Sequence, residues 1–511
     1  MTEQQMAFFH ACVSRKRKIR FLKGLTVCIL VVLTIVSIAG FFKARKAEKT
    51  AEQERDRAVK QKNLALKAVN VLTYDLADEL AKIPRAQNIL KQILQTNTEL
   101  LEEISALNPD TTEAQREKAS NLSRAGDNYL LMGNLEEAVK AYQQCSDIFK
   151  KLADANPNDT DAQRNLSVSF EKLGDVNLQL GDTQSALKSY QDSHEILAKL
   201  AESDPANTQA QRDLSVSYNK LGNVNLNLGD TQSALKSYQQ SHEILAKLAE
   251  SDPANTQAQR DLSVSYNKLG NVNLQLGDTQ SALKSYQDSL EISRKLAESD
   301  PTNTQAQRDF FISSSKIGDL QVLLGDMQAA LEAYKNVLEI SKQMAESDPK
   351  NTQAQRDLSI SYNKLGDVNL NLEDTQSALK SYQADLEIRR KLAESDPANT
   401  QAQRDLSISY NKLGDVNLQL GDTQSALKSY QDSHEILAKL AESDPANTQA
   451  QSDWMKSLVR IGILQPDSQS KKEYLEKALA IAEELAEKDK YNQQAQKELN
   501  AVKEIMKLLG E

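Results

Sequence analysis

A 48-residue unit recurs along most of this chain, and its fixed length constrains the fold more than any other feature. In register, a glycine that usually follows leucine and precedes a polar turn returns every 48 residues. These glycines are Gly126, Gly174, Gly222, Gly270, Gly318, Gly366, Gly414 and Gly462. A period of this size is typical of stacked solenoids, in which each unit buries its apolar face against its neighbours. The sequence therefore predicts a layered array.

Each unit is predicted to form two antiparallel helices, which we name helix A and helix B. In the unit 207–254, Asn207 can cap helix A over 208–228, and a Gly-Asp turn ends that helix. Helix B follows over 231–251 and ends before Pro253, because proline disfavours helical geometry in the preceding residue. The residues predicted to be buried are Ala210, Leu214, Tyr218, Leu221, Val224 and Leu228 in helix A, and Ala234, Leu235, Tyr238, Leu245, Leu248 and Ala249 in helix B.

This pattern resembles the tetratricopeptide repeat family. The matching residues are Tyr218, Leu221, Gly222, Gly229, Ala234, Tyr238 and Ser241 in this unit, and Leu122, Gly126, Tyr129, Gly133, Ala138, Tyr142 and Cys145 in the first unit. The family unit has about 34 residues, so each helix here is longer by about two turns. The resemblance implies an all-α fold, a right-handed superhelical solenoid of antiparallel helix pairs whose inner surface is lined by helix A.

Two departures from the family pattern carry structural expectations. Where the family has an aromatic residue in helix A, most units have asparagine, and a ladder of buried amides that fixes the register between layers is expected. These asparagines are Asn177, Asn225, Asn273, Asn369 and Asn417. Glu373 replaces the glycine of the neighbouring turns, so a left-handed backbone there would be unfavourable and the layer weaker.

The segment before the array predicts a membrane anchor. Residues 24–42 are 19 residues without a charge, and as a helix they would span about 28 Å, close to the thickness of a bilayer core. A cleaved signal peptide, with Ser37 and Ala39 near the cleavage site, is the alternative. The basic cluster within 1–23 favours a cytoplasmic N-terminus and an array on the far side, although residues 43–62 are also rich in lysine and arginine.

The rest of the chain divides by composition. Residues 43–66 contain good helix formers with charges on every face, which predicts a solvated stalk; a coiled-coil homo-oligomer through this stalk is an open alternative. The predicted segments are 1–23, a basic leader; 24–42, the transmembrane helix; 43–66, the stalk; 67–116, diverged leading helices; 117–464, the repeats; and 465–511, the last helix B and a capping helix.

Charge and motifs exclude several classes of function. Residues 1–63 carry 14 Lys and Arg against 5 Asp and Glu, which leaves 48 against 67 in the remaining 448 residues. An acidic array repels phosphate backbones, so no nucleic-acid partner is expected. No nucleotide, dinucleotide or nucleophile motif is present, and His194, His242 and His434 are copies of one helix B position rather than a ligand cluster. We therefore expect no enzyme activity, cofactor or metal.

Helix A offers a polar face instead. The resemblance places Val216, Asn219, Asn223, Leu226 and Asn227 on the inner surface, and the three asparagines are four residues apart, which puts them on one side of the helix. The counterparts in other units are Asn267, Asn271 and Gln275; Asn363, Asp367 and Asn371; and Asn411, Asp415 and Gln419. An amide-rich groove can hydrogen-bond a peptide, and these residues are the predicted protein-binding site. Polarity that only keeps an exposed helix soluble is the competing interpretation.

Two functional readings follow. The first is a membrane-anchored scaffold or sensor that binds protein or peptide partners through its repeats; the layout is similar to the sensor half of bacterial signalling proteins. The second is a structural spacer or self-associating layer without a specific ligand. The units that begin at Asp213 and Asp261 differ at only six of 48 positions, so the groove is nearly periodic. A periodic surface suits a repetitive partner or a spacer.

Overall fold

A computed structural model describes residues 112–488 and 493–509, together with residues 92, 95, 96 and 99. The predicted leader, span and stalk, and the leading helices up to residue 111 apart from those four positions, lie outside the described residues. Among the helices that the structure does describe, none combines the length and the apolar character that crossing a bilayer requires.

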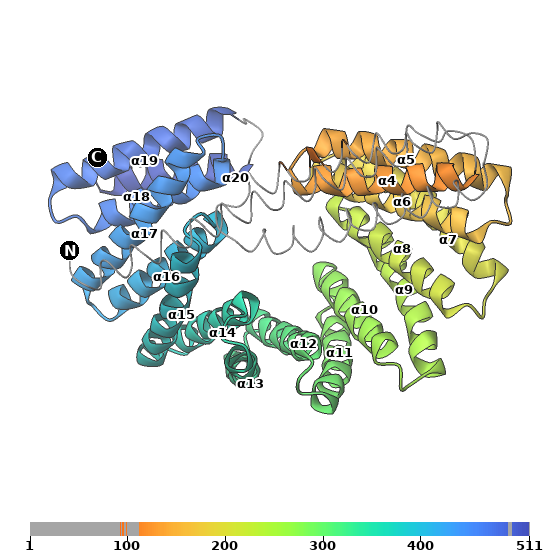
Figure 1. The fold of residues 1–511 in the computed structure, drawn as a ribbon. Coiled ribbons are helices and arrows are strands. Elements are labelled where there is room, and N and C mark those ends of the chain that lie inside the picture. Colours follow the sequence, from red (N-terminus) through yellow and green to blue (C-terminus); the bar gives the residue numbers. More distant parts are fainter. Residues whose placement is uncertain (1–91, 93–94, 97–98, 100–111, 489–492, 510–511) are drawn as a thin grey trace, which may run out of the picture. The chain divides into compact units, whose positions relative to one another are not determined.

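The described residues form 17 helices, which confirms the prediction of an all-α, tetratricopeptide-like solenoid of helix pairs (Figure 1). The helix A and helix B pairs are α4 (Thr112–Leu131) and α5 (Leu135–Ala155), α6 (Thr160–Gln179) and α7 (Thr183–Ser203), α8 (Thr208–Asn227) and α9 (Thr231–Ser251), α10 (Thr256–Gln275) and α11 (Thr279–Ser299), α12 (Thr304–Leu323) and α13 (Met327–Ser347), α14 (Thr352–Asn371) and α15 (Thr375–Ser395), α16 (Thr400–Gln419) and α17 (Thr423–Ser443), and α18 (Thr448–Leu464) and α19 (Ser468–Lys488), followed by α20 (Gln493–Leu508).

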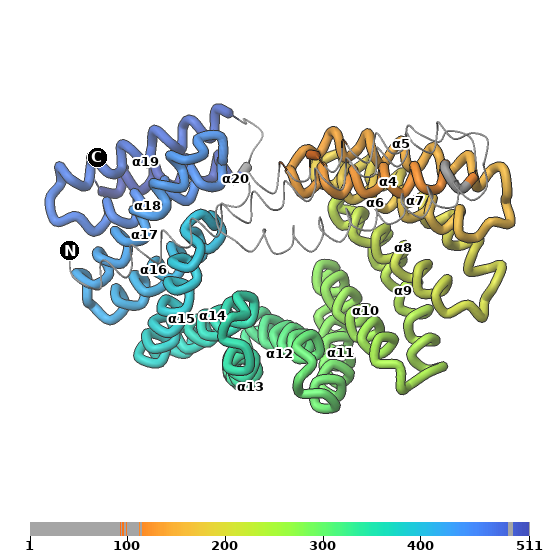
Figure 2. Tube along the Cα trace, in the orientation of Figure 1, coloured from red at the N-terminus to blue at the C-terminus, as the bar shows by residue number. Residues whose placement is uncertain are grey.

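The chain divides into two compact units, of which the first ends at Ile196 and the second begins at Leu197, within α7. In the first unit, α5 packs against both α4 and α6. In the second unit, each helix from α8 to α20 packs against the next one in chain order, as the tube in Figure 2 traces. Each layer of the second unit is therefore packed against the layers next to it in the sequence.

The helix ends explain why the units break where they do. Asn207 Oδ1 accepts a hydrogen bond from the amide of Ala210 at 3.0 Å and so caps α8, as predicted. At the other end, Gly229 has a φ of +80°, and the amide of Asp230 donates to the carbonyl of Asn225 at 2.9 Å. This glycine-centred arrangement satisfies the last carbonyls of the helix and reverses the chain toward α9.

Glu373 is the one exception among the turns between α6 and α17. Its φ is +63°, and no other described residue apart from glycine has a positive φ. The turn keeps the same hydrogen bonds, since the amide of Glu373 donates to the carbonyl of Leu370 at 3.1 Å. The backbone at this position is therefore left-handed, as it is at the glycines of the neighbouring turns. A side chain in this conformation costs about 1 kcal/mol or more relative to glycine.

The core of each layer is built on a contact between helix A glycine and helix B tyrosine. A Cβ atom added to Gly222 would lie 2.4 Å from Cε1 of Tyr238, and six other repeats have the same contact at 2.4 to 2.6 Å. Tyr238 and Ala234 pack with Val272 of the next layer. The recurring glycine of the sequence is therefore required by close helix packing.

The buried stripe of helix A differs in part from the prediction. Ser215 and Ser217 are 1% exposed, whereas Leu228, which was expected to be buried, is 36% exposed. Both serines donate hydrogen bonds back to helical carbonyls at 2.7 Å, so they enter the core without an unpaired hydroxyl. Small side chains let successive helices approach closely, and Leu228 lies too near the end of α8 to be covered.

Helix α20 repeats the pattern of a helix A and then departs from it. Gln496 donates to the carbonyl of Ala486 at 3.1 Å, which is the contact that Gln451 makes with Ala441 in the preceding layer. Eleven residues after Gln496, where helix A has its glycine, α20 has Lys507. A lysine there leaves no room for another helix B tyrosine, and the capping role of this helix stays a prediction.

Candidate protein-binding face

The predicted binding residues of the second unit lie on helix A in three rows, each four residues from the next. The first row is Asn219, Asn267, Asn363 and Asn411; the second row is Asn223, Asn271, Asp367 and Asp415; the third row is Asn227, Gln275, Asn371 and Gln419. The first row is half-buried and the third is exposed, while the second row is half-buried apart from the exposed Asn223. The three rows therefore have different surroundings.

The first row faces the neighbouring helices. Nδ2 of Asn267 donates to Ser313 Oγ of the next helix A at 3.2 Å, and Nδ2 of Asn363 contacts Asp385 Oδ2 of helix B at 3.5 Å. Oδ1 of Asn219, Asn267 and Asn411 is buried and accepts no hydrogen bond from the described residues. These amides are consequently placed to join layers more than to meet a partner.

The second row is the centre of a polar contact that repeats from layer to layer. The hydroxyl of the helix B tyrosine donates to the second-row side chain fifteen residues earlier, for example from Tyr382 to Asp367 Oδ1 at 2.6 Å. The lysine of the next helix A then binds the same carboxylate, as Lys412 does at 2.6 Å. Burial raises the pKa of Tyr382 well above its usual range, and the bond to Asp367 raises it further.

We name this tyrosine, second-row residue and lysine a hub. The lysine ammonium also lies over the tyrosine ring, at 5.9 Å from the ring centroid for Lys412 and Tyr382. Lys172 and Lys364 bind Asp127 and Asp319 in the same way. A cation that bridges a carboxylate and an aromatic face is favourable, so the hub ties each helix A to the preceding layer.

Two consecutive hubs differ from the rest because the carboxylate is replaced by an amide. In the first, Tyr238 donates to Asn223 Oδ1 at 2.8 Å, and Lys268 donates to the same oxygen at 3.1 Å. In the second, Tyr286 donates to Asn271 Oδ1 at 2.8 Å, and Lys316 forms no ion pair within the described part of the chain. Both lysines therefore lack the counter-charge that Asp319, Asp367 and Asp415 supply elsewhere.

The surroundings of Lys268 lower its pKa. Its pKa is lowered from the usual lysine value, first by partial burial and second by repulsion from Lys220, which lies on the preceding helix A. No described carboxylate forms an ion pair with this ammonium. Helices α8, α10 and α12 thus present a row of lysines, Lys220, Lys268 and Lys316, beside two neutral amides.

The third row and the apolar positions complete the face. Asn227, Gln275 and Gln419 are exposed, and the exposed Asn371 donates to the carbonyl of Asp367 in its own helix at 2.8 Å. Val216 is 37% exposed, whereas Leu226 is half-buried and packs beside Tyr238. Val216 and the third row are therefore the predicted residues most open to a partner.

Ion pairs between an arginine of one helix A and an aspartate of the next set the position of each helix A, and we name this series the arginine ladder. Arg212 binds Asp261 of the next layer at 2.5 Å, and Gln257 donates to the same carboxylate at 2.7 Å. The same pairing recurs at 49-residue spacing in Arg260 with Asp309, Arg308 with Asp357, Arg356 with Asp405, and Arg404 with Asp453. Partly exposed pairs of this kind contribute little each, about 0 to 1 kcal/mol, but their repetition fixes the register.

The expected asparagine ladder is not formed by side chains. Asn369 and Asn417 are buried, while Asn177, Asn225 and Asn273 are half-buried, and no hydrogen bond between successive amides is found in the described layers. Their backbone carbonyls instead accept the bond that closes each helix A. The hubs and the arginine ladder take the role that was expected of these amides. The sequence contained a signal for the hubs, because lysine, aspartate and tyrosine recur in it at the same 48-residue period.

A polar groove lies beside the helix A residues near the C-terminal end of the second unit. It has a volume of about 190 Å³ and is lined by Arg404, Ser407, Ile408, Asn411, Lys412, Asp415, Leu437, Asp453, Lys456 and Arg460. Its cations are already paired, since Lys456 binds Glu498 at 2.8 Å and Arg404 binds Asp453 at 2.6 Å. Arg460 approaches Asp415 only at 3.9 Å. This groove has less uncompensated charge than the two asparagine hubs.

The described residues contain no group of three or more histidine, cysteine or acidic side chains that could hold a metal ion. Two of the repeated histidines contact the next helix A: Nδ1 of His242 lies 2.9 Å from Ser265 Oγ, and Nδ1 of His434 lies 2.8 Å from Ser457 Oγ. Burial lowers the pKa of both imidazoles. These histidines are packing residues between layers.

Comparison with protein families finds repeats of one kind. Residues 213–295 match one family model, and residues 119–152 and 315–344 match another, both described as tetratricopeptide repeat. No curated protein is a significant sequence match to the chain.

Several solved structures are similar in fold. A STAND signal-transduction ATPase with a tetratricopeptide repeat sensor from Pyrococcus horikoshii is 15% identical, with 81% of this chain and 54% of that chain covered and a TM-score of 0.43. A Rap protein complexed with competence and sporulation factor is 14% identical, with coverages of 82% and 99% and a TM-score of 0.37. A putative kinesin light chain with nearly identical repeats from Podospora anserina is 17% identical, with coverages of 46% and 98% and a TM-score of 0.33. At these identities the similarity concerns the fold alone.

Proposed function

Because the chain carries tetratricopeptide repeats, we propose that it is a protein-binding scaffold whose second unit captures an acidic segment of a partner protein. The proposed contact surface is the helix A face of α8, α10 and α12, centred on the two asparagine hubs. Lys268 and Lys316 would bind partner carboxylates, and the exposed third-row amides Asn227 and Gln275 would hydrogen-bond the partner backbone.

The observation that supports this location is the missing counter-charge. In the layers with aspartate hubs, the carboxylate of Asp319 or Asp367 neutralises the lysine internally. In the layers of Asn223 and Asn271, the same lysine meets a neutral amide or no acceptor. Bringing a partner carboxylate to Lys268 would supply the missing charge and relieve the repulsion from Lys220. Charge-assisted hydrogen bonds of this type contribute about 1.5 to 3 kcal/mol when they are shielded from water.

The experiment restores the counter-charge inside the protein. The variant Asn223→Asp/Asn271→Asp gives Lys268 and Lys316 the carboxylates that other layers have. We expect a fluorescent peptide of alternating Glu and Ala to bind the original protein, and to bind the variant at least about tenfold more weakly, a change of about 1.4 kcal/mol. Binding should also weaken as salt rises, since partly exposed charges are screened.

A matched control separates this effect from net charge. The variant Asn227→Asp/Gln275→Asp adds the same two charges to the exposed third row of the same helices, without a described contact to the hub lysines. It should retain most of the affinity. If the two variants weaken binding equally, or if a peptide of alternating Gln and Ala binds as well as the acidic one, the proposed site is wrong. The structural spacer is then the better reading.

We also propose that residues 24–42 anchor the scaffold in a membrane, with the N-terminus in the cytoplasm and the repeats on the far side. The support is the uncharged run of 19 residues beside a basic cluster. A sensor role, in which the repeats report partner binding to a separate effector, is the extension of this proposal. Recovery of the intact chain in the soluble fraction after lysis would exclude the anchor, and protease accessibility in sealed vesicles tests the orientation.

A further inference from the structure

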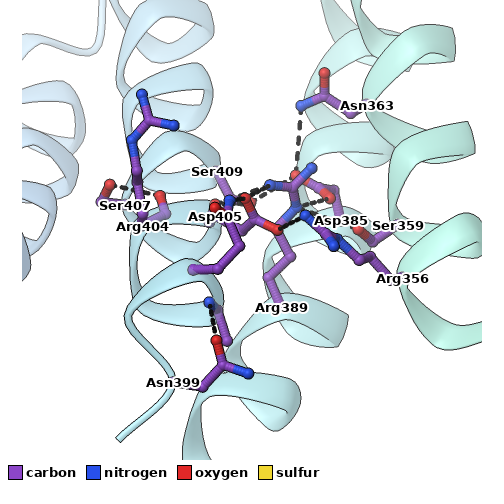
Figure 3. Close-up of polar contacts among 12 residues, drawn as sticks. Arg356, Ser359, Asn363, Asp385, Arg389, Asn399, Arg404, Asp405, Ser407 and Ser409 are labelled. Atoms are coloured by element: carbon purple, nitrogen blue, oxygen red, sulfur yellow. Dashed lines mark hydrogen bonds and ion pairs between the residues drawn. The ribbon is translucent and has the colours of Figure 1, made fainter. Parts of the chain in front are cut away.

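One helix B of the second unit carries an ion pair whose two side chains are both buried. Asp385 is 0% exposed and Arg389 is 8% exposed, and Arg389 Nε donates to Asp385 Oδ1 at 2.8 Å (Figure 3). The pair lies on α15 and is enclosed by α14 and α16. Ser409 donates to Asp385 Oδ2 at 2.6 Å, and Arg389 Nη1 donates to the carbonyl of Asp405 at 3.0 Å. A further bond from Arg389 Nε to Ser359 Oγ, at 3.2 Å, reaches the preceding helix A.

The equivalent positions in the other layers are uncharged. They are Cys145 and Phe149, Ser193 and Leu197, Ser241 and Leu245, Ser289 and Ser293, Val337 and Ser341, and Ser433 and Leu437. The comparison with α9 is the most direct, because Ser241 and Leu245 have the same pattern of buried serines around them: α8 and α10 supply serines at the positions that Ser359 and Ser409 occupy beside α15. The ion pair is therefore a substitution in an otherwise repeated environment.

The joint between α15 and α16 also borders an open cavity. This cavity has a volume of about 360 Å³ and is lined by Arg390, Ala393, Glu394, Pro397, Gln403, Leu406, Tyr410, Asp432, Glu435, Ile436 and Lys439. These residues belong to α15, α16, α17 and the turn after α15. The cavity therefore borders the same helix that carries the buried ion pair, although neither Asp385 nor Arg389 lines it. In contrast, α12, α13 and α14 share an apolar cluster that includes Phe311, Tyr334 and Val337.

The turn between α14 and α15 adds a third difference, because Glu373 adopts a left-handed backbone that the other turns between α6 and α17 assign to glycine. The strained turn and the buried ion pair lie in the same helix pair. The layer of α14 and α15 thus combines two features that lower its stability relative to its near-copies.

From this combination we propose that the joint between α15 and α16 is the point at which the second unit opens. Separation at either joint exposes an apolar cluster to water, which is Ala378, Tyr382 and Val416 here and Ala234, Tyr238 and Val272 at the matched joint. Separation at the joint between α15 and α16 also returns Asp385 and Arg389 to water and so regains their hydration. The bonds of the pair to Ser359, Ser409 and the carbonyl of Asp405 also make the closed state well defined, because they form only when α14, α15 and α16 are in register. The joint divides the second unit into a block that ends with α15 and a block that begins with α16.

Hydrogen exchange measured by mass spectrometry on the full chain tests this proposal. In the unmodified protein, amides of α15 and α16 should exchange at least about tenfold faster than those of α9 and α10, the matched joint. The variant Asp385→Ser/Arg389→Leu recreates the pair of α9. It should slow exchange at the α15 and α16 joint by about tenfold or more, because buried ion pairs are often less stabilising than packed apolar residues.

Two results would overturn the proposal. One is exchange at α15 and α16 that is no faster than at α9 and α10 in the unmodified protein, a comparison that needs no variant to fold. The other is a folded double variant whose joint exchanges as fast as the original. As a further comparison, Glu373→Gly should slow exchange across α14 and α15 while leaving α9 and α10 unchanged. The proposal does not depend on the acidic-peptide site, which lies on other helices.

Discussion

At the scale of single residues, the layers differ at a few positions whose effects can be isolated because the repeats provide their own controls. Glu373, Asn223 and Asp385 each replace a residue that a nearly identical layer retains. A substitution that restores the common residue changes one contact in a known environment. The measured effect can therefore be assigned to that contact with little ambiguity from the surrounding sequence.

Glu373→Gly is expected to stabilise the protein. Glycine adopts a φ of +63° without the Cβ penalty, so the free energy of unfolding should rise by about 1 kcal/mol. The loss of a side chain from the unfolded state offsets part of this gain. Urea unfolding followed by circular dichroism measures it. Gly277→Ala, at the equivalent turn with a φ of +82°, is the reverse control and should destabilise; stabilisation by both variants would contradict the explanation.

At the scale of helices and layers, much of the structure could be predicted from the sequence, and the failures have a common cause. In the unit 207–254, helix B has the predicted bounds, 231–251, because the Gly-Asp turn before it and the Asp-Pro break after it are local signals. Burial of Ser215 and Ser217 was missed because hydrophobic periodicity gives no weight to a serine that bonds its own helix. The hubs were missed because they join residues 45 positions apart. Local patterns therefore predicted the elements, while contacts between layers required coordinates.

Acidification should weaken the contact between α9 and α10. Ser265 Oγ donates to the carbonyl of Leu262 at 2.7 Å, so it must accept from His242, whose Nδ1 then carries a hydrogen and whose Nε2 titrates. Burial holds the pKa of His242 below that of an unfolded histidine, an effect that Asp288 and Glu243 partly oppose. The unfolded state therefore binds the proton more tightly, and stability falls as pH decreases through about 6.5 toward the folded pKa.

The control for this pH effect is His242→Leu, since Leu290 occupies the same position in the next layer. The urea midpoint of the original protein should decrease more between pH 7.5 and pH 5 than that of the variant. Carboxylates titrate in both proteins, so the difference between the two decreases isolates the imidazole. Equal decreases would show that His242 does not contribute to the pH dependence.

At the scale of the whole molecule, the near-identity of layers makes their number a variable. Deletion of residues 261–308 places Asp309 directly after Arg260 and preserves the spacing of the arginine ladder, since Arg212 then meets Asp309 in place of Asp261. Stability in such arrays is approximately a sum of layer and interface terms. We expect a folded protein with the same helical content per residue, a smaller dependence of unfolding free energy on urea and a lower melting temperature. Loss of the fold on removing this one layer would contradict additive stacking.

The arginine ladder has a consequence for a chain that is divided in two. Each rung takes its arginine from one layer and its aspartate from the following one, so a break at a turn between layers leaves an arginine without its acid on one piece and an aspartate without its base on the other. The exposed ends are then complementary in shape and in sign. Separately expressed halves should find each other and rejoin, which makes this architecture suited to fragment complementation.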